Sequence, residues 1–334
     1  MRRTLVVLVP IPFLVISLVP ERLVRANRDA HIAESVGPQV GDSVSRVSPE
    51  ANSAREELAH LQKQTGLTVS VVAYEGVGIL DFEKRAFTFR TLGFKGNGIA
   101  GAVSRDGTTV ALFNTLSNPY SVLVLQPGMD LVREFPGVVA VPACWSNDNL
   151  RLVLIRGESE IQILDLASSV LQTLPIADAL NEGPINAQCW SPDGKQIVYA
   201  STDGYVCVYD LEKHNSTNLA KGTDPTWPPE ANWIAYRGGA TYRAIRPSGG
   251  GQKKLFHKTR AVSPLYWSPD SRFVLYIHED FFALDVEFYH LMVRRLADGS
   301  EESVADVTNV ASGNIQWIQN PELIKWVEAG PRTR

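Results

Sequence analysis

The sequence predicts an all-β protein: a six-bladed β-propeller of four-stranded antiparallel blades, preceded by a signal peptide and a short helix. Three observations favour this fold. A turn signature recurs six times, its copies lie 42, 45, 37, 40 and 50 residues apart, and alternating apolar residues follow each copy. Such periods are typical of supersecondary units that stack or close into a ring, and apolar residues two apart occupy one face of a strand.

Residues 1–26 are predicted to form a signal peptide. Arg2 and Arg3 precede an apolar run from Leu5 to Val19, and Ala26 ends a candidate cleavage site. This layout is typical of exported proteins. An uncleaved membrane anchor is the alternative, although the run is short for a membrane span and contains two prolines. The expected location is therefore periplasmic or secreted, with no stable membrane span after cleavage.

Residues 27–67 are predicted to form a flexible leader and one short helix. Residues 27–47 are polar and show no hydrophobic period. Ser48 is the expected N-cap, Pro49 lies in the first turn, and Gly66 is the expected stop. Three apolar side chains share one face of this helix: Ala54, Leu58 and Leu61. We expect that face to pack on the propeller rim, with docking of a partner as the alternative.

Residues 68–334 contain the repeated signature and are assigned to the propeller. Its clearest copies are Trp190-Ser191-Pro192-Asp193-Gly194 and Trp267-Ser268-Pro269-Asp270-Ser271. Weaker copies begin at Val103, Trp145 and Trp227, and an eroded copy begins at Trp317. Proline presets φ, aspartate accepts hydrogen bonds from turn N–H groups, and glycine tolerates positive φ. Each turn should therefore lead directly into a strand, including one that contains Ile324 and Trp326 after the last copy.

The repeated residues are interpreted as structural. We expect the tryptophans to wedge between neighbouring blades and the acidic residues to cap turns rather than bind calcium. The residues assigned this role are Trp145, Asp148, Trp190, Asp193, Trp227, Trp267, Asp270 and Trp317.

The Trp-Ser-Pro-Asp-Gly signature at residues 190–194 resembles the WD-like repeat of TolB-type β-propellers. The resemblance covers roughly Val77 to Val327. It implies the propeller fold and a role as a protein-interaction scaffold. TolB carries an α/β domain ahead of its propeller, whereas residues 27–67 here contain a single predicted helix. The sequence is therefore expected to lack that domain.

Closure of the ring is predicted to join the two ends of the propeller. Only seven residues follow Val327, so the last copy can supply two strands at most. The runs Val77–Phe82 and Ala86–Arg90 are expected to complete the last blade, because pairing them there removes exposed sheet edges. The run Thr68–Tyr74 does not fit this count and is either an extra strand or part of a seventh blade. Six blades remain the prediction.

The three cysteines, Cys144, Cys189 and Cys207, are predicted to be buried small apolar side chains. Cys189 and Cys207 lie two strands apart in one predicted blade, which is too far for a disulfide. Cys144 and Cys189 each precede a repeated tryptophan, so a link between adjacent blades stays open as the alternative.

The charge balance indicates which partners to expect. The formal net charge is −4, and removal of residues 1–26, with four Arg and one Glu, makes it −7. An acidic protein without basic clusters is not expected to bind nucleic acid. A chain of this length can bury a large core, so we expect that it needs neither metals nor disulfides for stability. We also expect the protein to be monomeric.

The sequence contains no recognisable catalytic motif. Residues 96–101 spell a dinucleotide fingerprint, but a strand rather than a helix is expected after them. No Gly-x-Ser-x-Gly elbow occurs, and the six histidines show no paired metal-ligand spacing. The cluster His278-Glu279-Asp280 is interpreted as a solvated turn. We therefore predict a non-catalytic protein with no cofactor or metal.

Binding is expected on one face of the ring. The resemblance implies that the connections between second and third strands lie on the face where propellers usually bind partners, with the connections between blades around the channel mouth. The candidate binding residues on these connections are Arg156, Asp203, Arg237, His278 and Glu279. In the fifth blade the connection continues through the aromatic-rich residues 281–289, as a protein-binding ridge or as longer strands. The favoured function is an exported protein-interaction scaffold; the alternative is a propeller-type enzyme or carbohydrate-binding protein that uses the channel mouth.

Overall fold

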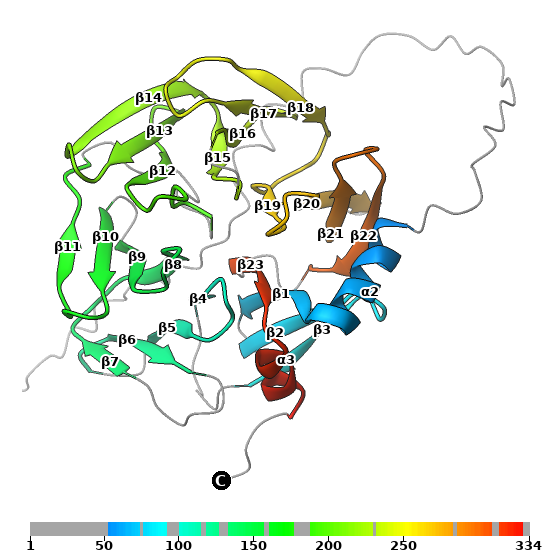
Figure 1. Ribbon diagram of the computed structural model, residues 1–334, viewed down its shortest axis with the longest axis horizontal. Helices are drawn as coiled ribbons and strands as arrows, with labels where there is room; N and C mark the ends of the chain where they lie inside the picture. Colours follow the sequence, from blue (N-terminus) through cyan, green and yellow to red (C-terminus); the bar gives the residue numbers. More distant parts are fainter. Residues whose placement is uncertain are drawn as a thin grey trace, which may run out of the picture. The chain divides into compact units, whose positions relative to one another are not determined.

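The computed structural model describes residues 53–73, 76–91, 100–114, 118–126, 133–156, 160–176, 188–229, 232–282, 286–308 and 314–329. The predicted signal peptide and leader lie outside these ranges, as do Ser48, Pro49 and most of the glycine-rich motif at 96–101. The described residues form six antiparallel sheets around a common centre (Figure 1). This arrangement confirms the predicted six-bladed β-propeller.

Blades 1 to 3 follow the order of the chain. Blade 1 consists of β4 (Gly101–Val103), β5 (Val110–Asn114), β6 (Ser121–Leu125) and β7 (Arg133–Pro136). Blade 2 consists of β8 (Val141–Trp145), β9 (Arg151–Arg156), β10 (Glu160–Asp165) and β11 (Leu171–Thr173). Blade 3 consists of β12 (Gln196–Ala200), β13 (Tyr205–Asp210) and β14 (Asn215–Lys221). Its innermost position is held by Trp190, which forms an isolated bridge with Ile197.

Blades 4 to 6 complete the ring. Blade 4 consists of β15 (Thr223–Thr226), β16 (Ile234–Gly238), β17 (Thr241–Ile245) and β18 (Lys253–His257). Blade 5 consists of β19 (Tyr266–Trp267), β20 (Phe273–Phe282), β21 (Val286–Arg295) and β22 (Glu301–Asp306). Blade 6 consists of β23 (Asn314–Gln319), β1 (Leu67–Ala73), β2 (Gly76–Asp81) and β3 (Ala86–Arg90). In each blade the first-named strand lies nearest the centre and the last lies toward the rim (Figure 1).

Blade 6 closes the ring by pairing the two ends of the propeller. Strand β23 pairs with β1 from Leu67 opposite Gln319 to Val72 opposite Asn314. The run that begins at Thr68 is therefore the second strand of the closing blade, and no seventh blade is needed to place it. The N-terminal part supplies three strands and the C-terminal part supplies one.

The chain turns into a helix after β23, so the strand predicted to contain Ile324 and Trp326 is wrong. These residues lie in α3 (Pro321–Glu328). The side chain of Asn320 caps this helix by accepting hydrogen bonds from the backbone N–H groups of Glu322 (2.8 Å) and Leu323 (3.1 Å). Proline at the first helical position suits a helix start because its missing N–H would have no partner there. The combination of cap and proline overrides the strand pattern of the repeat.

The N-terminal helix α2 (Ala54–Thr65) begins after Ser53 rather than after the predicted Ser48. Ser53 and Glu56 form a capping box in which each side chain accepts a hydrogen bond from the other's backbone N–H. This reciprocal bonding satisfies two N–H groups that would otherwise lack partners. Gly66 ends the helix in the left-handed conformation with φ 71°, as its position predicted.

Helix α2 lies against blades 5 and 6. Ala54 and Leu58 are buried in a cluster that contains residues of both blades. Glu57 forms ion pairs with Arg272 and Arg295 of blade 5, the latter at 2.9 Å. The apolar face and these charges fix the helix on the rim. Within the part of the chain that the structure describes, no helix is long and apolar enough to cross a membrane.

The repeated turns share one hydrogen-bond pattern. In the copy at residues 191–196, the hydroxyl of Ser191 donates to Asp193 (2.5 Å) and accepts from the N–H of Gln196 (2.9 Å). Asp193 also accepts from the N–H of Lys195 (3.1 Å). The same contacts recur at three further serine–aspartate pairs: Ser104 and Asp106, Ser146 and Asp148, and Ser268 and Asp270. The buried serine thus joins the turn to the strand that follows.

The repeated tryptophans are buried at the junctions between blades. The indole N–H groups of Trp145 and Trp317 donate to backbone oxygens of the preceding blade at 3.0 Å, and that of Trp267 donates to the Thr226 hydroxyl at 3.2 Å. The indole nitrogens of Trp190 and Trp227 are buried without a hydrogen-bond partner. The shared role of the five side chains is therefore apolar packing, and the hydrogen bond is a feature of three of them.

A disulfide joins Cys144 of blade 2 to Cys189 of blade 3, so the expectation of three reduced cysteines is wrong for this pair. Equivalent positions on neighbouring innermost strands bring the two Cα atoms to 6.3 Å, within the range that a disulfide spans. Cys207 is a buried reduced thiol whose sulfur lies 3.2 Å from the side-chain oxygen of Asn218.

Candidate functional site

The five candidate residues lie where second strands of blades end. Arg156 ends β9, Asp203 lies in the turn between β12 and β13, and Arg237 lies near the end of β16. His278 and Glu279 lie within β20, at the level where the other second strands end. The antiparallel topology therefore places all five on the same side of the ring.

Contacts within single blades hold three of these side chains. Arg156 pairs with Glu160 across the strand pair β9–β10 at 3.6 Å, and Asp203 is exposed in its turn. Arg237 and His278 pair with carboxylates of their own blades, Asp224 and Asp280. The structure therefore does not gather Arg156, Arg237 and His278 into one compact site.

The ion pair of Arg237 with Asp224 lies in blade 4. Two guanidinium nitrogens lie 2.7 Å from one carboxylate oxygen, and both side chains are largely buried. Burial alone would lower the pKa of the Arg237 guanidinium, but the Asp224 carboxylate reverses this effect and raises it. Burial, and secondarily the same carboxylate, raise the pKa values of the Tyr242 and Tyr266 hydroxyls. This pair is a fixed structural element of the blade.

The hairpin β20–β21 distinguishes blade 5 from the others. Each of its strands has ten residues, and they pair continuously from Phe273 opposite Arg295 to Phe282 opposite Val286. The second strands of the other blades have five to seven residues. The connection at residues 281–289 therefore includes extensions of both strands, one of the two alternatives that the sequence left open.

The base of this hairpin carries a cluster of titratable side chains. Asp280 lies between two histidines: one oxygen is 3.4 Å from Nδ1 of His278, and the other is 3.4 Å from Nε2 of His290. The two histidines are direct cross-strand neighbours. Sequence reasoning missed His290 because it lies twelve positions away along the chain; a hairpin register centred on residue 284 would have placed it opposite His278.

The environment of His278 favours its neutral form. Burial lowers the pKa of His278 below its ordinary value, and Lys258, Arg260 and His290 act in the same direction. Asp280 acts in the opposite direction without cancelling these effects. The cluster can therefore accept or donate a hydrogen bond through a neutral imidazole near pH 7. Among the residues that the structure describes, no three or more His, Cys, Asp or Glu side chains are arranged so that they could hold a metal ion.

The side-chain amides of Gln188 and Asn314 form hydrogen bonds between blades near the centre of the ring. The side chain of Gln188 binds both peptide groups of Trp267 at 2.8 Å, which links blade 3 to blade 5 across blade 4. Nδ2 of Asn314 donates to the backbone oxygen of Ala143 at 2.6 Å, which links blade 6 to blade 2 across blade 1. These bonds join innermost strands that are not neighbours, so they brace the centre of the ring.

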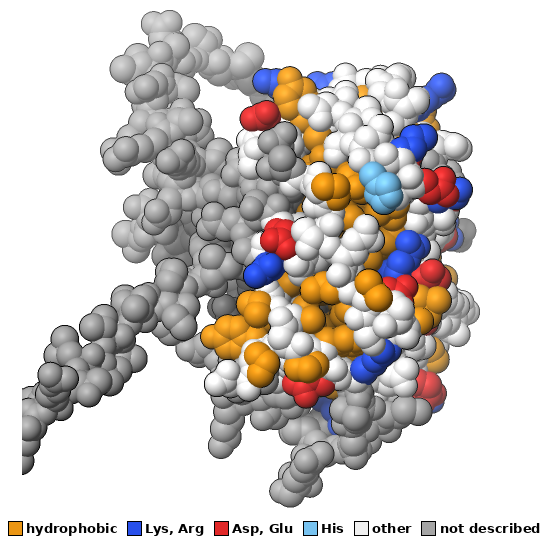
Figure 2. Space-filling model, turned by 90° about the vertical axis from the view of Figure 1, so that its left-hand side faces the viewer, with side chains coloured by type: hydrophobic (Ala, Val, Ile, Leu, Met, Phe, Trp, Pro, Cys, Tyr) orange, Lys and Arg blue, Asp and Glu red, His pale blue; other side chains and the backbone are white. Residues whose placement is uncertain are grey.

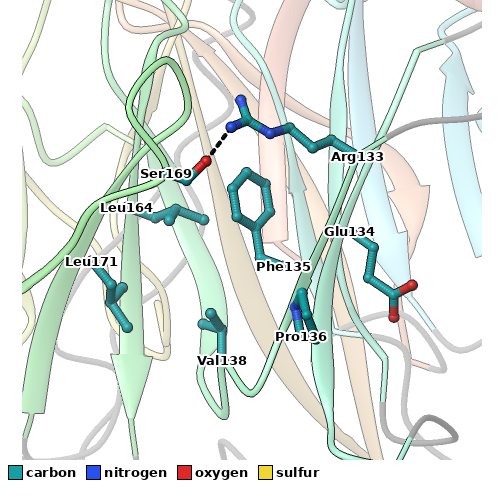
Figure 3. Close-up of a pocket in the computed structure, with 8 residues that line it drawn as sticks. All are labelled: Arg133, Glu134, Phe135, Pro136, Val138, Leu164, Ser169 and Leu171. Carbon is teal, nitrogen blue, oxygen red and sulfur yellow. Dashed lines mark hydrogen bonds between the residues drawn. The ribbon is translucent and has the colours of Figure 1, made fainter.

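A groove of about 280 Å³ lies on the rim between blades 1 and 2 (Figure 3). Phe135 and Arg133 point toward blade 2, and the Arg133 guanidinium donates to the Ser169 hydroxyl. Hydrophobic side chains also gather in the lower half of this side of the ring (Figure 2). The groove belongs to the outer rim and contains none of the five candidate residues.

Comparison with known proteins gives only partial sequence matches. No protein-family model matches the chain. An mRNA export factor of Xenopus tropicalis is 29% identical over 130 residues, which cover 39% of this chain and 30% of that protein. The mRNA export factor of Bos taurus is 26% identical over 99 residues, which cover 30% of this chain and 23% of that protein. The matches thus span less than a third of the length of these relatives.

Solved structures show a likeness over most of the chain. TolB from Acinetobacter baumannii aligns with a TM-score of 0.55 and 15% identity, covering 79% of this chain and 71% of that chain. The putative TolB from Agrobacterium tumefaciens aligns with a TM-score of 0.51 and 15% identity, covering 75% and 99%. At this identity the likeness concerns the fold alone. The described part of the chain is a six-bladed β-propeller with a TolB-like fold.

Proposed function

We propose that this protein is an exported, non-catalytic β-propeller that binds a protein partner through the face that carries the hairpin β20–β21. The observation that carries this proposal is the length of the hairpin, which continues past the level where the other blades end. The TolB-like fold is compatible with such a role. Export is proposed on the basis of the apolar run at residues 5–19.

The hairpin suits recognition because its backbone is already ordered. Continuous antiparallel pairing over ten residue pairs holds it in one conformation. An element that is ordered before binding avoids much of the conformational entropy loss that a flexible loop would undergo. The imidazoles of His278 and His290 and the carboxylate of Asp280 supply polar groups at its base. A partner would therefore meet a rigid projection with hydrogen-bonding groups beside it.

Crosslinking of the native envelope followed by mass spectrometry tests this proposal. In the test variant, residues 279–289 are replaced by Asn-Gly, which joins the hydrogen-bonded cross-strand pair His278 and His290 and shortens the hairpin to the length of its neighbours. In the control variant, alanines replace Lys195 and Glu212, an exposed ion pair of blade 3 on the side of the ring opposite to the candidate residues.

We expect the crosslinked partner to be lost in the hairpin variant and retained in the control, with both variants folded by circular dichroism. Capture of the same partner by the shortened protein would contradict the proposal. Stoichiometric metal in the purified protein, together with turnover of a polysaccharide, would instead favour the alternative of a propeller-type enzyme.

A further inference from the structure

Blade 4 has a charge that differs from that of the whole protein. Residues 223–258, which contain its four strands, include six Lys or Arg and two acidic residues, Asp224 and Glu230, whereas the chain as a whole has a formal net charge of −4. The expectation of a chain without basic clusters is therefore wrong for this blade. Sequence reasoning missed the cluster because its cations are spaced along three strands and become neighbours only in the folded sheet.

Four of these cations form what we call the basic edge: Arg243, Arg246, Lys253 and Lys254. Within the described part of the chain, none of the four has a carboxylate within ion-pair distance. By contrast, Arg237 pairs with Asp224, and Lys258 pairs with Glu301. Among the described residues, no carboxylate thus neutralises the positive charge of the basic edge at ion-pair distance.

One pair in the basic edge is unfavourable for the isolated protein. Arg243 lies directly opposite Lys254 across β17 and β18, and like charges in that position destabilise a sheet. On the other face, Arg246 and Lys253 lie over the ring of Trp233, at 5.4 and 4.3 Å from its centroid, where cation–π attraction holds them. Both faces of the blade therefore present cations next to its outer strand. An anionic partner would relieve the repulsion between Arg243 and Lys254.

The outer strand also has hydrogen-bonding groups available. Strand β18 is the last strand of its sheet, and among the described strands it pairs only with β17 (Figure 1). Lys258 donates its backbone N–H to Ala240, so the alternation of an antiparallel pair directs the N–H and C=O of His257 outward. Lys253 and Lys254 are exposed beside this edge. The edge therefore offers backbone groups framed by positive charge.

We propose that β18 binds an acidic segment of a protein partner by strand addition, at a site separate from the hairpin of blade 5. Lysines on an open edge repel a second copy of the same strand, which prevents self-association. The same lysines attract an extended segment rich in Asp and Glu, whose backbone completes the sheet while its carboxylates meet the cations on both faces. The charge pattern thus selects an acidic strand and rejects the protein's own edge.

Fluorescence anisotropy with the full chain tests the proposal, with a labelled synthetic peptide of repeated Glu-Glu-Val as the probe. We expect binding that weakens as salt is added, and a loss of at least about tenfold in affinity in the double variant K253E/K254E. The control K63E/K84E makes the same change in net charge on exposed lysines of α2 and blade 6 and should bind as the unmodified protein does. If K253E/K254E does not fold, K253Q/K254Q should show a smaller loss in the same direction.

Hydrogen exchange separates strand addition from simple attraction between charges. Bound peptide should slow exchange of the His257 amide by at least about tenfold, because that N–H gains a hydrogen bond. Equal affinity of K253E/K254E, or an unchanged exchange rate at saturation, would overturn the proposal. Tight binding of a sulfated polysaccharide or single-stranded DNA without amide protection would also overturn it, in favour of a polyanion surface. The variant with the shortened hairpin should still bind the peptide, so this test is independent of the proposed function.

Discussion

The titratable cluster at the base of the hairpin is the residue-scale feature with the clearest functional consequence. His278, Asp280 and His290 come from two strands, and the carboxylate of Asp280 contacts both imidazoles. Burial and the nearby cations of the connection between blades 4 and 5 oppose the charged form of His278. Asp280 is the group that favours that form, so it controls how far the pKa departs from its ordinary value.

We predict that Asp280→Asn lowers the pKa of His278 further, because it removes the charge that favours protonation. An NMR titration of the imidazole protons measures this change directly. The unmodified protein, titrated under the same conditions, is the control. An unchanged or raised pKa of His278 in the variant would show that Asp280 does not govern it.

The same shift has a consequence for stability. A histidine whose folded-state pKa is lowered binds fewer protons folded than unfolded, so the free energy of unfolding falls as the pH drops through the unfolded-state value of 6.5. His278→Gln should therefore lose less stability than the unmodified protein between about pH 7 and pH 5. Urea unfolding at several pH values measures the difference, and parallel curves for the two proteins would contradict it.

At this scale, the sequence predicted the roles of residues whose hydrogen-bond partners lie within two positions along the chain. The aspartates of the turn signature were expected to cap turns, and they accept hydrogen bonds from the N–H two residues ahead. The serine that precedes each of them was not singled out, because its acceptor role joins residues five positions apart. His290 was missed for a related reason: its neighbour is set by strand register, which a single sequence does not state.

At the scale of elements, the repeated turn leads into the second strand of a blade, as in β5, β9, β12 and β20. In its best-formed copies, a buried serine hydroxyl accepts the N–H of the first residues of the next strand, while its own N–H donates back to that strand. In the four blades that carry the serine–aspartate pair, the second strand therefore begins with a closed set of hydrogen bonds. The helices are explained by the same kind of local bonding, since Ser53 and Asn320 set their starts. The cap signals at Ser48 and Pro49 predicted too early a start for α2, and the apolar alternation at Ile324 and Trp326 predicted a strand in place of α3.

We predict that Ser191→Ala lowers the free energy of unfolding by about 1–3 kcal/mol, because the N–H of Gln196 loses its acceptor in a buried position. Urea denaturation measures the change. An unaltered dependence of the free energy of unfolding on urea concentration would show that the same surface is exposed on unfolding. Asp203→Ala, at an exposed turn of the same blade, is the matched control and should change stability little. Equal stability of the two variants would mean that the serine contributes nothing to the turn.

At the scale of the whole molecule, the ring is held together by links of different kinds. Strand β23 pairs with β1 and closes the circle through backbone hydrogen bonds. The amides of Gln188 and Asn314 join blades that are not neighbours. The sequence predicted that the ends would meet, because strand-like runs at both ends lacked a complete blade. It did not predict the amide links, because the contacts of a glutamine or asparagine side chain with a distant blade cannot be inferred from a single sequence.

The disulfide between blades 2 and 3 is the covalent member of this set, and its contribution is a property of the whole chain. Cys144 and Cys189 are separated by 45 residues, so the bond restricts the unfolded chain over a full blade. In the chain-entropy account, a loop of this length corresponds to about 4 kcal/mol of stabilisation, to which native packing adds or subtracts. We predict that the double variant C144A/C189A has a lower free energy of unfolding than the unmodified protein, by an amount that approaches this value when measured by urea denaturation.

Reducing agent should produce a similar loss of stability in the unmodified protein and none in the variant. Cys207→Ala serves as the control, because it removes a buried sulfur without opening the loop, and it should lose less stability and keep its response to reducing agent. A double variant as stable as the unmodified protein would mean that the noncovalent links alone keep blades 2 and 3 in register.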